Sequence, residues 1–471
     1  MVNPGTTEFP LRIAIIGSGP AGFYAADHLF KQKDVSIEID MFDRLPTPFG
    51  LVRGGVAPDH QKIKNVTRVF DRIARRDEFR FYGNVEIGRD LSVDDLLRHY
   101  HGVVFATGAQ TDRSLGIPGE NLAGSHSATE FVAWYNGHPD FRHLEFDLSR
   151  ENVVIIGVGN VAVDVARILC RTVDELVTTD IADYALEALR ESKVRNVYML
   201  GRRGPAQAAF TNPEARELGE LPGADIVFDA AELELDEVTQ KLLGPEPDRD
   251  TRTKLEILDE LAHRESKGAP RRLFLRFLVS PVELIGDEEG HVHEVRIVHN
   301  RLVERNGRSR PVPTDEFETL PAGLVFRSVG YRGVPVPGMP FDKQSGTIPN
   351  RLGRVVDPET REIVPGLYVA GWIKRGPSGV IGTNKPDSVE TAEQVLEDLR
   401  EGHVHTPEAP SRESIRQVIA VRRPDHFTYE DWLCVDDHET ALGATCGRPR
   451  VKLTSVEEML SALRQAAPEK D

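Results

Sequence analysis

Cysteine is scarce in this 471-residue sequence, which contains only Cys170, Cys434 and Cys446. None of these residues forms a CxxC pair, so a disulfide framework and a thiolate zinc site are excluded. An iron–sulfur cluster normally requires four cysteine ligands, and this chain cannot supply them. We therefore expect a reducing, cytoplasmic setting and no metal centre.

Long apolar runs and a surplus of basic residues are also missing. No uninterrupted apolar segment reaches the roughly 18 residues of a membrane-spanning helix, so we expect no membrane insertion. The formal net charge of −17 argues against broad nucleic-acid binding, because phosphates require an excess of Lys and Arg. The first ten residues lack the blocks of a signal or transit peptide, so we expect no cleavage or export.

The beginning of the chain carries a strand, a glycine turn and a helix in succession. The apolar run Leu11–Ile16 leads into Gly17-Ser-Gly-Pro-Ala-Gly22, followed by a helical pattern. Gly17 permits the tight turn, Gly19 lets the backbone approach a pyrophosphate, and Gly22 allows close packing of helix and strand. The next apolar run ends at Asp43, where an acid can accept hydrogen bonds from ribose hydroxyls. A glycine turn that binds nothing is the alternative interpretation.

A second opening of the same kind begins at Asn152–Ile156 and continues into Gly157-Val-Gly-Asn-Val-Ala162, with alanine in the third glycine position. The following strand, Asn196–Leu200, ends in Arg202 and Arg203 rather than in an acid. Guanidinium groups pair with phosphate oxygens, so this turn favours NADP(H) over NAD(H). A solvated arginine pair at a strand end is the alternative.

These two openings predict an α/β protein with two dinucleotide-binding (Rossmann-like) domains. An acid-ended first turn and an arginine-ended second turn indicate a flavoprotein that takes hydride from NADPH onto FAD. The strand and turn at 101–108 resemble the crossover into an inserted NADP domain. We therefore expect an FAD-binding domain at 1–110 and 331–402, an NADP-binding domain at 111–330, and a C-terminal extension at 403–471.

Several longer stretches resemble one family, the adrenodoxin reductase-like NADPH:ferredoxin oxidoreductases, including their bacterial members. The resemblance covers about residues 10 to 400, and its turn at 371–372 carries tryptophan where general FAD disulfide reductases usually have aspartate. The stretches that carry it are Gly17–Leu29, Pro46–Val66, Phe81–Asp90, Phe131–Pro139, Gly157–Leu169, Gly201–Thr211 and Val369–Lys385.

The resemblance implies a set of site residues. For FAD it implies the glycine turn with Pro20 and Ala21, together with Asp43, Leu51, Val85, Trp372, Gly379, Val380 and Ile381. For NADP(H) it implies Arg113, Val158, Gly159, Asn160, Val161, Arg202, Arg203, Glu214 and again Gly379. It places His60 and Asp164 near the flavin and nicotinamide, where they would deliver a proton or order the site.

Four of these residues also have purely structural interpretations. His60 could be a partly exposed histidine at the start of a helix, and Trp372 could be ordinary core. Glu214 follows Asn212-Pro213, and an acid in a first helical turn stabilises a helix without any ligand. Asp164 lies in an apolar helix, where an unpaired carboxylate would be costly, so we expect a partner or cofactor beside it.

The acceptor implied by the family is a separate iron–sulfur ferredoxin that takes electrons one at a time, with a cytochrome P450 system as one downstream destination. An acidic reductase must show an acidic ferredoxin a local basic surface. The candidates are a helix from 61 to 76 and the stretch from 249 to 276. The extension either packs onto the reductase or serves partner docking or regulation. It ends in a helix with a capping box of Thr454 and Glu457.

Other functions are not excluded by the sequence. A subunit similar to the small subunit of glutamate synthase would also pass NADPH electrons to a partner, but such subunits carry cysteine-rich cluster motifs. A silent NADP(H)-binding protein and an enzyme whose main activity is diaphorase or oxygen reduction are the remaining alternatives.

Overall fold

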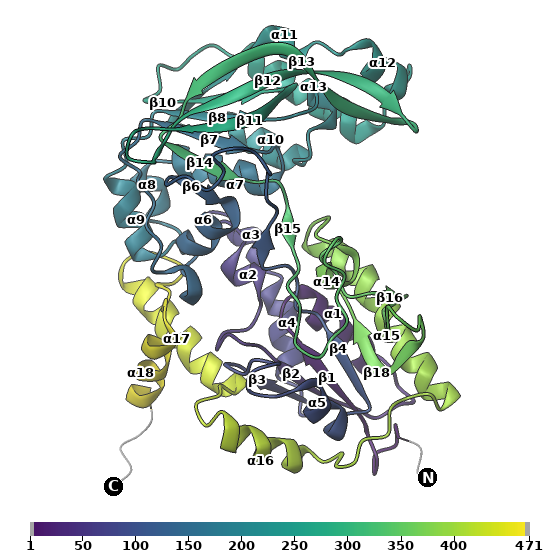
Figure 1. Cartoon of the computed structure of the whole chain (residues 1–471). Helices are drawn as coiled ribbons and strands as arrows, with labels where there is room; N and C mark the ends of the chain where they lie inside the picture. Colours follow the sequence, from purple (N-terminus) through teal and green to yellow (C-terminus); the bar gives the residue numbers. More distant parts are fainter. Residues whose placement is uncertain (1–3, 467–471) are drawn as a thin grey trace. The chain divides into compact units, whose positions relative to one another are not determined.

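A computed structural model describes residues 4–466 and divides this range into two compact units (Figure 1). Unit 1 contains residues 4–56, 60–111 and 331–466, and unit 2 contains residues 57–59 and 112–330. Unit 2 is thus inserted in the sequence of unit 1. The connecting strands β5 (Thr111–Asp112) and β15 (Tyr331–Arg332) pair with each other.

Unit 1 is built on a seven-stranded sheet of order β16-β17-β18-β4-β1-β2-β3. The strands β18, β4, β1, β2 and β3 run parallel, and β17 and β16 extend the edge in antiparallel pairing. All six residues of β1 are buried, as expected of a parallel strand covered on both faces. The bounds are β1 Leu11–Ile16, β2 Ile37–Phe42, β3 Phe79–Tyr82, β4 Gly102–Phe105, β16 Asn350–Arg351, β17 Arg354–Val356 and β18 Ile363–Val369.

Helix α1 (Pro20–Phe30) of unit 1 packs along α15 (Asn384–Glu401). The predicted helix from 61 to 76 is wrong as a single element, since it divides into α3 (Gln61–Lys64) and α4 (Thr67–Ala74). At the start of α4 the amides of Arg68 and Val69 donate to carbonyls three residues back, those of Asn65 and Val66, so the regular ladder of hydrogen bonds is interrupted between the two helices. The other helices are α2 Leu51–Gly54, α5 Val93–His99, α14 Trp372–Arg375 and η3 Ile381–Thr383.

Unit 2 contains a six-stranded parallel sheet of order β6-β14-β7-β8-β10-β9 and a separate three-stranded antiparallel sheet, β11-β12-β13. Both large sheets and their flanking helices confirm the predicted α/β class. The strands are β6 Ser125–Ser127, β7 Asn152–Ile156, β8 Asn196–Leu200, β9 Ala224–Phe228, β10 Arg271–Arg276, β11 Val279–Gly286, β12 Val292–Arg305, β13 Arg308–Pro321 and β14 Leu324–Arg327. The helices are α6 Ala128–Tyr135, η1 Pro139–Phe141, α7 Asn160–Cys170, α8 Val173–Leu176, α9 Asp183–Arg190, η2 Pro205–Gln207, α10 Asn212–Gly219, α11 Ala230–Leu233, α12 Glu237–Leu243 and α13 Arg249–Ala262.

The C-terminal segment forms α16 (Arg412–Arg422), α17 (Tyr429–Thr445) and α18 (Val456–Ala466), all within unit 1. The predicted capping box before α18 is wrong by one residue. The Ser455 hydroxyl accepts from the Glu458 amide, and the Glu458 carboxylate accepts from the Ser455 amide. No helix among residues 4–466 has the length and apolarity needed to cross a bilayer.

Candidate dinucleotide sites

The first glycine turn leaves a space at the N-terminus of α1. Gly17 has φ +104°, and a Cβ built there would lie 2.4 Å from the Ala106 carbonyl oxygen, so only glycine fits. A Cβ built on Gly19 would meet nothing within 4 Å. Pro20 opens the helix, whose N-cap Gly19 makes no side-chain cap hydrogen bond. The open space and the exposed helix end fit an anionic pyrophosphate.

Asp43 lies directly beside this turn. Its Oδ2 accepts hydrogen bonds from the Ser18 amide at 2.9 Å and the Ser18 hydroxyl at 2.6 Å, and its Oδ1 accepts from the Leu45 amide at 2.9 Å. Val85 is buried and donates its amide to the Asp43 carbonyl. Since Oδ2 already accepts two hydrogen bonds and Oδ1 only one, Oδ1 remains able to accept a hydrogen bond from a ribose hydroxyl. Leu51, the first residue of α2, is 37% exposed.

The turn after β18 lies against the same helix of unit 1. A Cβ on Gly371 would lie 2.6 Å from the Ala21 Cβ, so this turn abuts the first turn of α1. Trp372 is only half-buried; its indole Nε1 donates to the Ser378 carbonyl at 3.2 Å. A flat ligand can therefore reach both the ring and this glycine-rich backbone.

A cavity of about 450 Å³ in unit 1 lies beside this turn. Gly379 lines it, Val380 next in the chain is 50% exposed, and Ile381 begins η3 with its side chain half-buried. The three predicted residues of this stretch thus lie next to an open, partly apolar surface.

The second glycine turn repeats the geometry of the first. A Cβ on Gly157 would lie 2.2 Å from the Ser328 carbonyl oxygen, whereas one on Gly159 would meet nothing within 4 Å. The Asn160 side chain accepts from the Thr211 amide at 2.9 Å, and the Val158 carbonyl accepts from the amides of residues 209 and 210. Val161 packs half-buried against the core of unit 2. This turn therefore fits a second pyrophosphate and fixes the loop that follows β8.

The residues after β8 place several arginines together. Arg203 lines a cavity of about 330 Å³ in unit 2 with Arg308 and Arg310 of β13. Burial, with the neighbouring charges of Arg202 and Arg310, lowers the pKa of Arg203. Across residues 4–466, none of these four arginines forms an ion pair with a carboxylate. Unpaired positive charges around a cavity fit a phosphate ligand.

Sequence reasoning missed Arg308 and Arg310, because they come from a strand about a hundred residues later in the chain. Two arginines at alternate positions of a strand do not by themselves indicate a phosphate site. Arg113, which was predicted, is exposed, and its amide donates to the Gly330 carbonyl at 3.1 Å within unit 2.

A buried arginine joins four carboxylates within unit 2. The Arg167 side chain is fully buried, and its Nη1 lies 2.9 Å from Asp164, 3.3 Å from Glu214 and 2.9 Å from Glu217. Its Nη2 pairs with Asp59. Burial opposes the charged form, but the carboxylates outweigh it and raise the pKa of Arg167. The expected partner of Asp164 is therefore Arg167, which sequence reasoning missed although it lies three residues later on the same helix.

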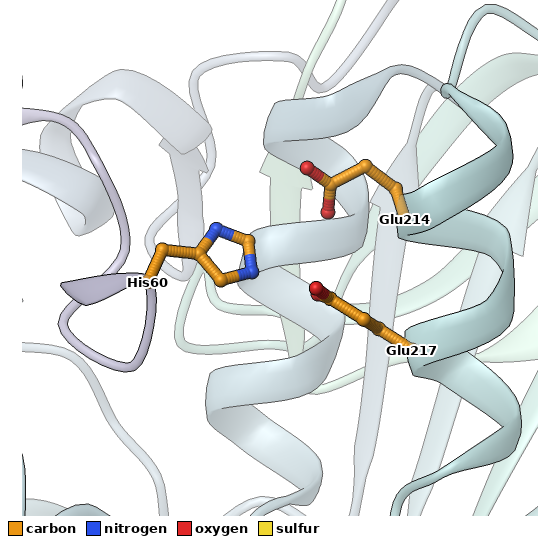
Figure 2. A group of neighbouring side chains, drawn as sticks. All are labelled: His60, Glu214 and Glu217. Carbon is orange, nitrogen blue, oxygen red and sulfur yellow. The ribbon is translucent and has the colours of Figure 1, made fainter. Parts of the chain in front are cut away.

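Glu214 and Glu217 lie one turn apart on α10, with their side chains on the same side of the helix (Figure 2). The N-cap residue of α10 is Thr211, which makes no side-chain cap bond, and Asn212 and Pro213 are the first two residues of the helix. His60 is the N-cap residue of α3 (Figure 2). Its carbonyl accepts from the amides of Ile63 and Lys64.

Comparison with known proteins covers nearly the whole chain. Residues 11–199 match the family described as pyridine nucleotide-disulphide oxidoreductase. The NADPH-ferredoxin reductase FprA of Mycobacterium tuberculosis is 46% identical over 461 residues, 96% of this chain and 98% of that protein. The mitochondrial NADPH:adrenodoxin oxidoreductase of Bos taurus is 44% identical over 97% of this chain and 93% of its own length.

A solved structure, Mycobacterium tuberculosis FprA in complex with NADPH, has a TM-score of 0.90 at 45% identity and covers 97% of this chain and 100% of that chain. The predicted limit of the resemblance near residue 400 is wrong, because matches of 96–98% of the chain must include most of residues 403–471. The confirmed resemblance therefore extends into the C-terminal segment, and the chain belongs to the family of adrenodoxin reductase-like NADPH–ferredoxin oxidoreductases.

Proposed function

We propose that unit 1 holds FAD and unit 2 holds NADP(H) in this ferredoxin–NADP⁺ reductase. The observation that carries the assignment is the contrast between the two glycine turns. The first has the carboxylate of Asp43 beside it, and the second is followed by Arg202 and Arg203, which lack carboxylate partners among residues 4–466. An acid suits a ribose diol, whereas unpaired guanidinium groups suit a 2′-phosphate.

Bound FAD supplies the chemistry that turns a two-electron hydride donor into a source of single electrons. The protein binds and orients the reactants around that chemistry. Gly19 and Gly159 leave room for the pyrophosphates at two helix ends, and a half-buried Trp372 offers an aromatic face next to the turn after β18. These contacts hold each cofactor in place within its own unit.

The proposed roles of His60 and Asp164 are to hold or move a proton, or to order the nicotinamide site. Support for the ordering role of Asp164 comes from its burial beside Arg167, because this ion pair fixes the direction of the carboxylate. Glu214 shares the same arginine and is proposed to bind NADP(H) from its position on α10. The domain limits 1–110 with 331–402 for FAD and 111–330 for NADP(H) follow from this assignment.

The partner is a ferredoxin of the kind named in the relatives' descriptions. We also propose that this ferredoxin is a separate protein, that a cytochrome P450 system is one downstream destination of the electrons, and that the reductase works in the cytoplasm. Three free cysteines, two of them exposed, support a reducing setting. For docking, both basic stretches present exposed cations without carboxylate partners among residues 4–466: Lys62, Arg68 and Arg72 in the first, and Arg249 and Arg252 in the second.

The test is an anaerobic spectral titration of the purified protein. NADPH should bleach the flavin absorbance at stoichiometric amounts where NADH does not, and oxidised ferredoxin should then restore it. A colourless protein that FAD cannot reconstitute would contradict the proposal and favour a silent NADP(H)-binding protein. Bleaching that ferredoxin leaves unchanged but oxygen or a dye reverses would favour a diaphorase or oxidase.

A further inference from the structure

A short loop of unit 1, residues 49–55, lies directly on the first glycine turn. The Phe49 amide donates to the Ser18 carbonyl at 3.0 Å. A Cβ built on Gly50 would lie 2.9 Å from the Gly19 Cα, so the two backbones are in contact. The position of this loop therefore decides how closely the pyrophosphate space at Gly19 is covered. We call residues 49–55 the cover loop.

The cover loop is held by the C-terminal segment through a buried ion pair. Both terminal nitrogens of Arg53 donate to the carboxylate of Glu439 on α17, at 2.9 and 2.6 Å. The Arg53 side chain is 12% exposed, and that of Glu439 is not exposed at all. This paired geometry is the strongest form of a guanidinium–carboxylate bond and specifies direction as well as distance.

Aromatic contacts reinforce the same junction. The Arg53 guanidinium lies 5.1 Å from the ring centroid of Trp432 on α17, and this ring meets Phe49 edge-on at 5.9 Å. Trp432 is 2% exposed and Phe49 is 7% exposed. The segment thus contacts both ends of the stretch from Phe49 to Arg53.

The residues after α17 complete the enclosure of Glu439. The carboxylate also accepts from Arg450 Nη1 at 3.0 Å and from the Leu453 amide at 2.8 Å, while Lys452 Nζ donates to the Arg53 carbonyl at 3.3 Å. Burial alone would raise the pKa of Glu439, but the charges and hydrogen bonds of Arg53 and Arg450 outweigh it and lower the pKa. Glu439 therefore stays ionised at neutral pH.

We propose that the C-terminal segment is a clamp on the cofactor site, in which Glu439 positions the cover loop over the first glycine turn and so slows the release of FAD. Glu439 acts through Arg53 and is a positioning residue. This inference rests on the proposed function, because it takes FAD as the occupant of that turn. It gives the C-terminal segment a role in cofactor retention, in addition to its packing on unit 1.

The experiment measures FAD release from the purified holoenzyme after dilution into flavin-free buffer, followed by the rise in flavin fluorescence. Glu439→Gln removes the buried counter-charge of Arg53, while Arg450 keeps its ion pair with Asp436, so release should be faster by about tenfold or more. Trypsin cleavage after Arg53, followed by mass spectrometry of the fragments, should accelerate in the same variant because the cover loop opens more often. This second measurement does not depend on activity.

Arg412→Gln is the matched control. Arg412 anchors the same segment elsewhere in unit 1, through Glu38 at 3.1 Å and the Asp77 carbonyl at 2.9 Å. The FAD release rate of this variant should stay within about twofold of the wild type, since none of these partners of Arg412 lies in the cover loop. Equal acceleration in both variants would overturn the clamp, because general loosening of the segment would then explain release.

Arg53→Lys keeps the charge but loses the paired bond, and it carries the test if Glu439→Gln does not fold. Its release should be several-fold faster than that of the wild type, and an unchanged rate would overturn the inference. A wild-type protein that binds no FAD would overturn the proposed function itself, whereas wild-type retention with unchanged release from Glu439→Gln would overturn only the clamp.

Discussion

Replacing Arg203 by glutamine should weaken NADPH binding while leaving the fold as stable as before or more so. Arg203 lies near Arg202 and Arg310 and lacks a carboxylate partner within residues 4–466, and the neighbouring positive charges contribute to its lowered pKa. The unliganded protein therefore bears a repulsion that a bound phosphate would relieve. Removing one guanidinium relieves part of that repulsion without any ligand.

The size of each effect follows from the contacts. A charge-assisted hydrogen bond contributes about 1.5–3 kcal/mol, so one lost guanidinium–phosphate contact should raise the Kd for NADPH by about 10- to 150-fold. NADH lacks the 2′-phosphate, and its Kd should change by less than about twofold. Because Arg203 is partly exposed, relief of repulsion should raise the free energy of unfolding by about 0.5 kcal/mol at most.

The assay is a titration of the Arg203→Gln protein with NADPH and with NADH by calorimetry, together with urea unfolding of the coenzyme-free protein. Arg301→Gln is the control, because Arg301 is exposed on β12 and does not line the cavity. Arg310→Gln should reproduce the selective loss of NADPH affinity. An equal rise in the Kd for NADPH and for NADH would refute the 2′-phosphate assignment. A fall in the free energy of unfolding above about 1 kcal/mol would mean that Arg203 stabilises the fold.

Three other changes test the remaining site. Arg167→Met should lower the free energy of unfolding by about 3–5 kcal/mol in urea, because it removes the buried positive charge that four carboxylates share, and Arg167→Lys should lower it by less. Asp43→Asn should raise the Kd for FAD by roughly tenfold, measured by flavin fluorescence, and an unchanged Kd would remove Asp43 from the ribose site. Burial and the charge of Arg12 lower the pKa of His101 from 6.5 to about 4. Between these values the unfolded chain binds a proton that the folded chain does not, so stability should fall as the pH falls from 6.5 towards 4. His101→Gln should flatten that pH dependence, and an unaltered slope would contradict the assignment.

The features that the sequence predicted correctly are local in the chain. The two strand–turn–helix units lie within runs of about 20 residues, and their glycines are required by backbone contacts at 17 and 157. Asp43 comes directly after β2, and only Gly201 separates Arg202 from the end of β8. The positions of both charged groups could therefore be predicted from where the strands end in the sequence. The family resemblance, carried by long uninterrupted stretches, was also available from the sequence and is confirmed by the comparisons.

The features that could not be predicted depend on distant pairing. Arg310 reaches Arg203 from a separate antiparallel sheet, and no local periodicity reports the register of that sheet. Arg167 pairs with Asp59 across more than a hundred residues of sequence. The errors at 61–76 and at Thr454 are of another kind, since hydrophobic spacing alone does not show where a helix is interrupted or which of two neighbouring hydroxyls caps it.

The two glycine turns share a backbone geometry, so the difference between their sites lies in what surrounds them. At the first turn, Ser18 donates two hydrogen bonds to Oδ2 of Asp43 before any ligand arrives, and Oδ1 can still accept one. At the second, Arg202, Arg203 and Arg310 repel one another and find no carboxylate within residues 4–466. The chain has a net charge of −17, so the fold must position this arginine cluster away from the many Asp and Glu side chains that could pair with it. A phosphate can accept hydrogen bonds from more than one guanidinium group, so under the proposed assignment the 2′-phosphate of the coenzyme would supply the missing negative charge.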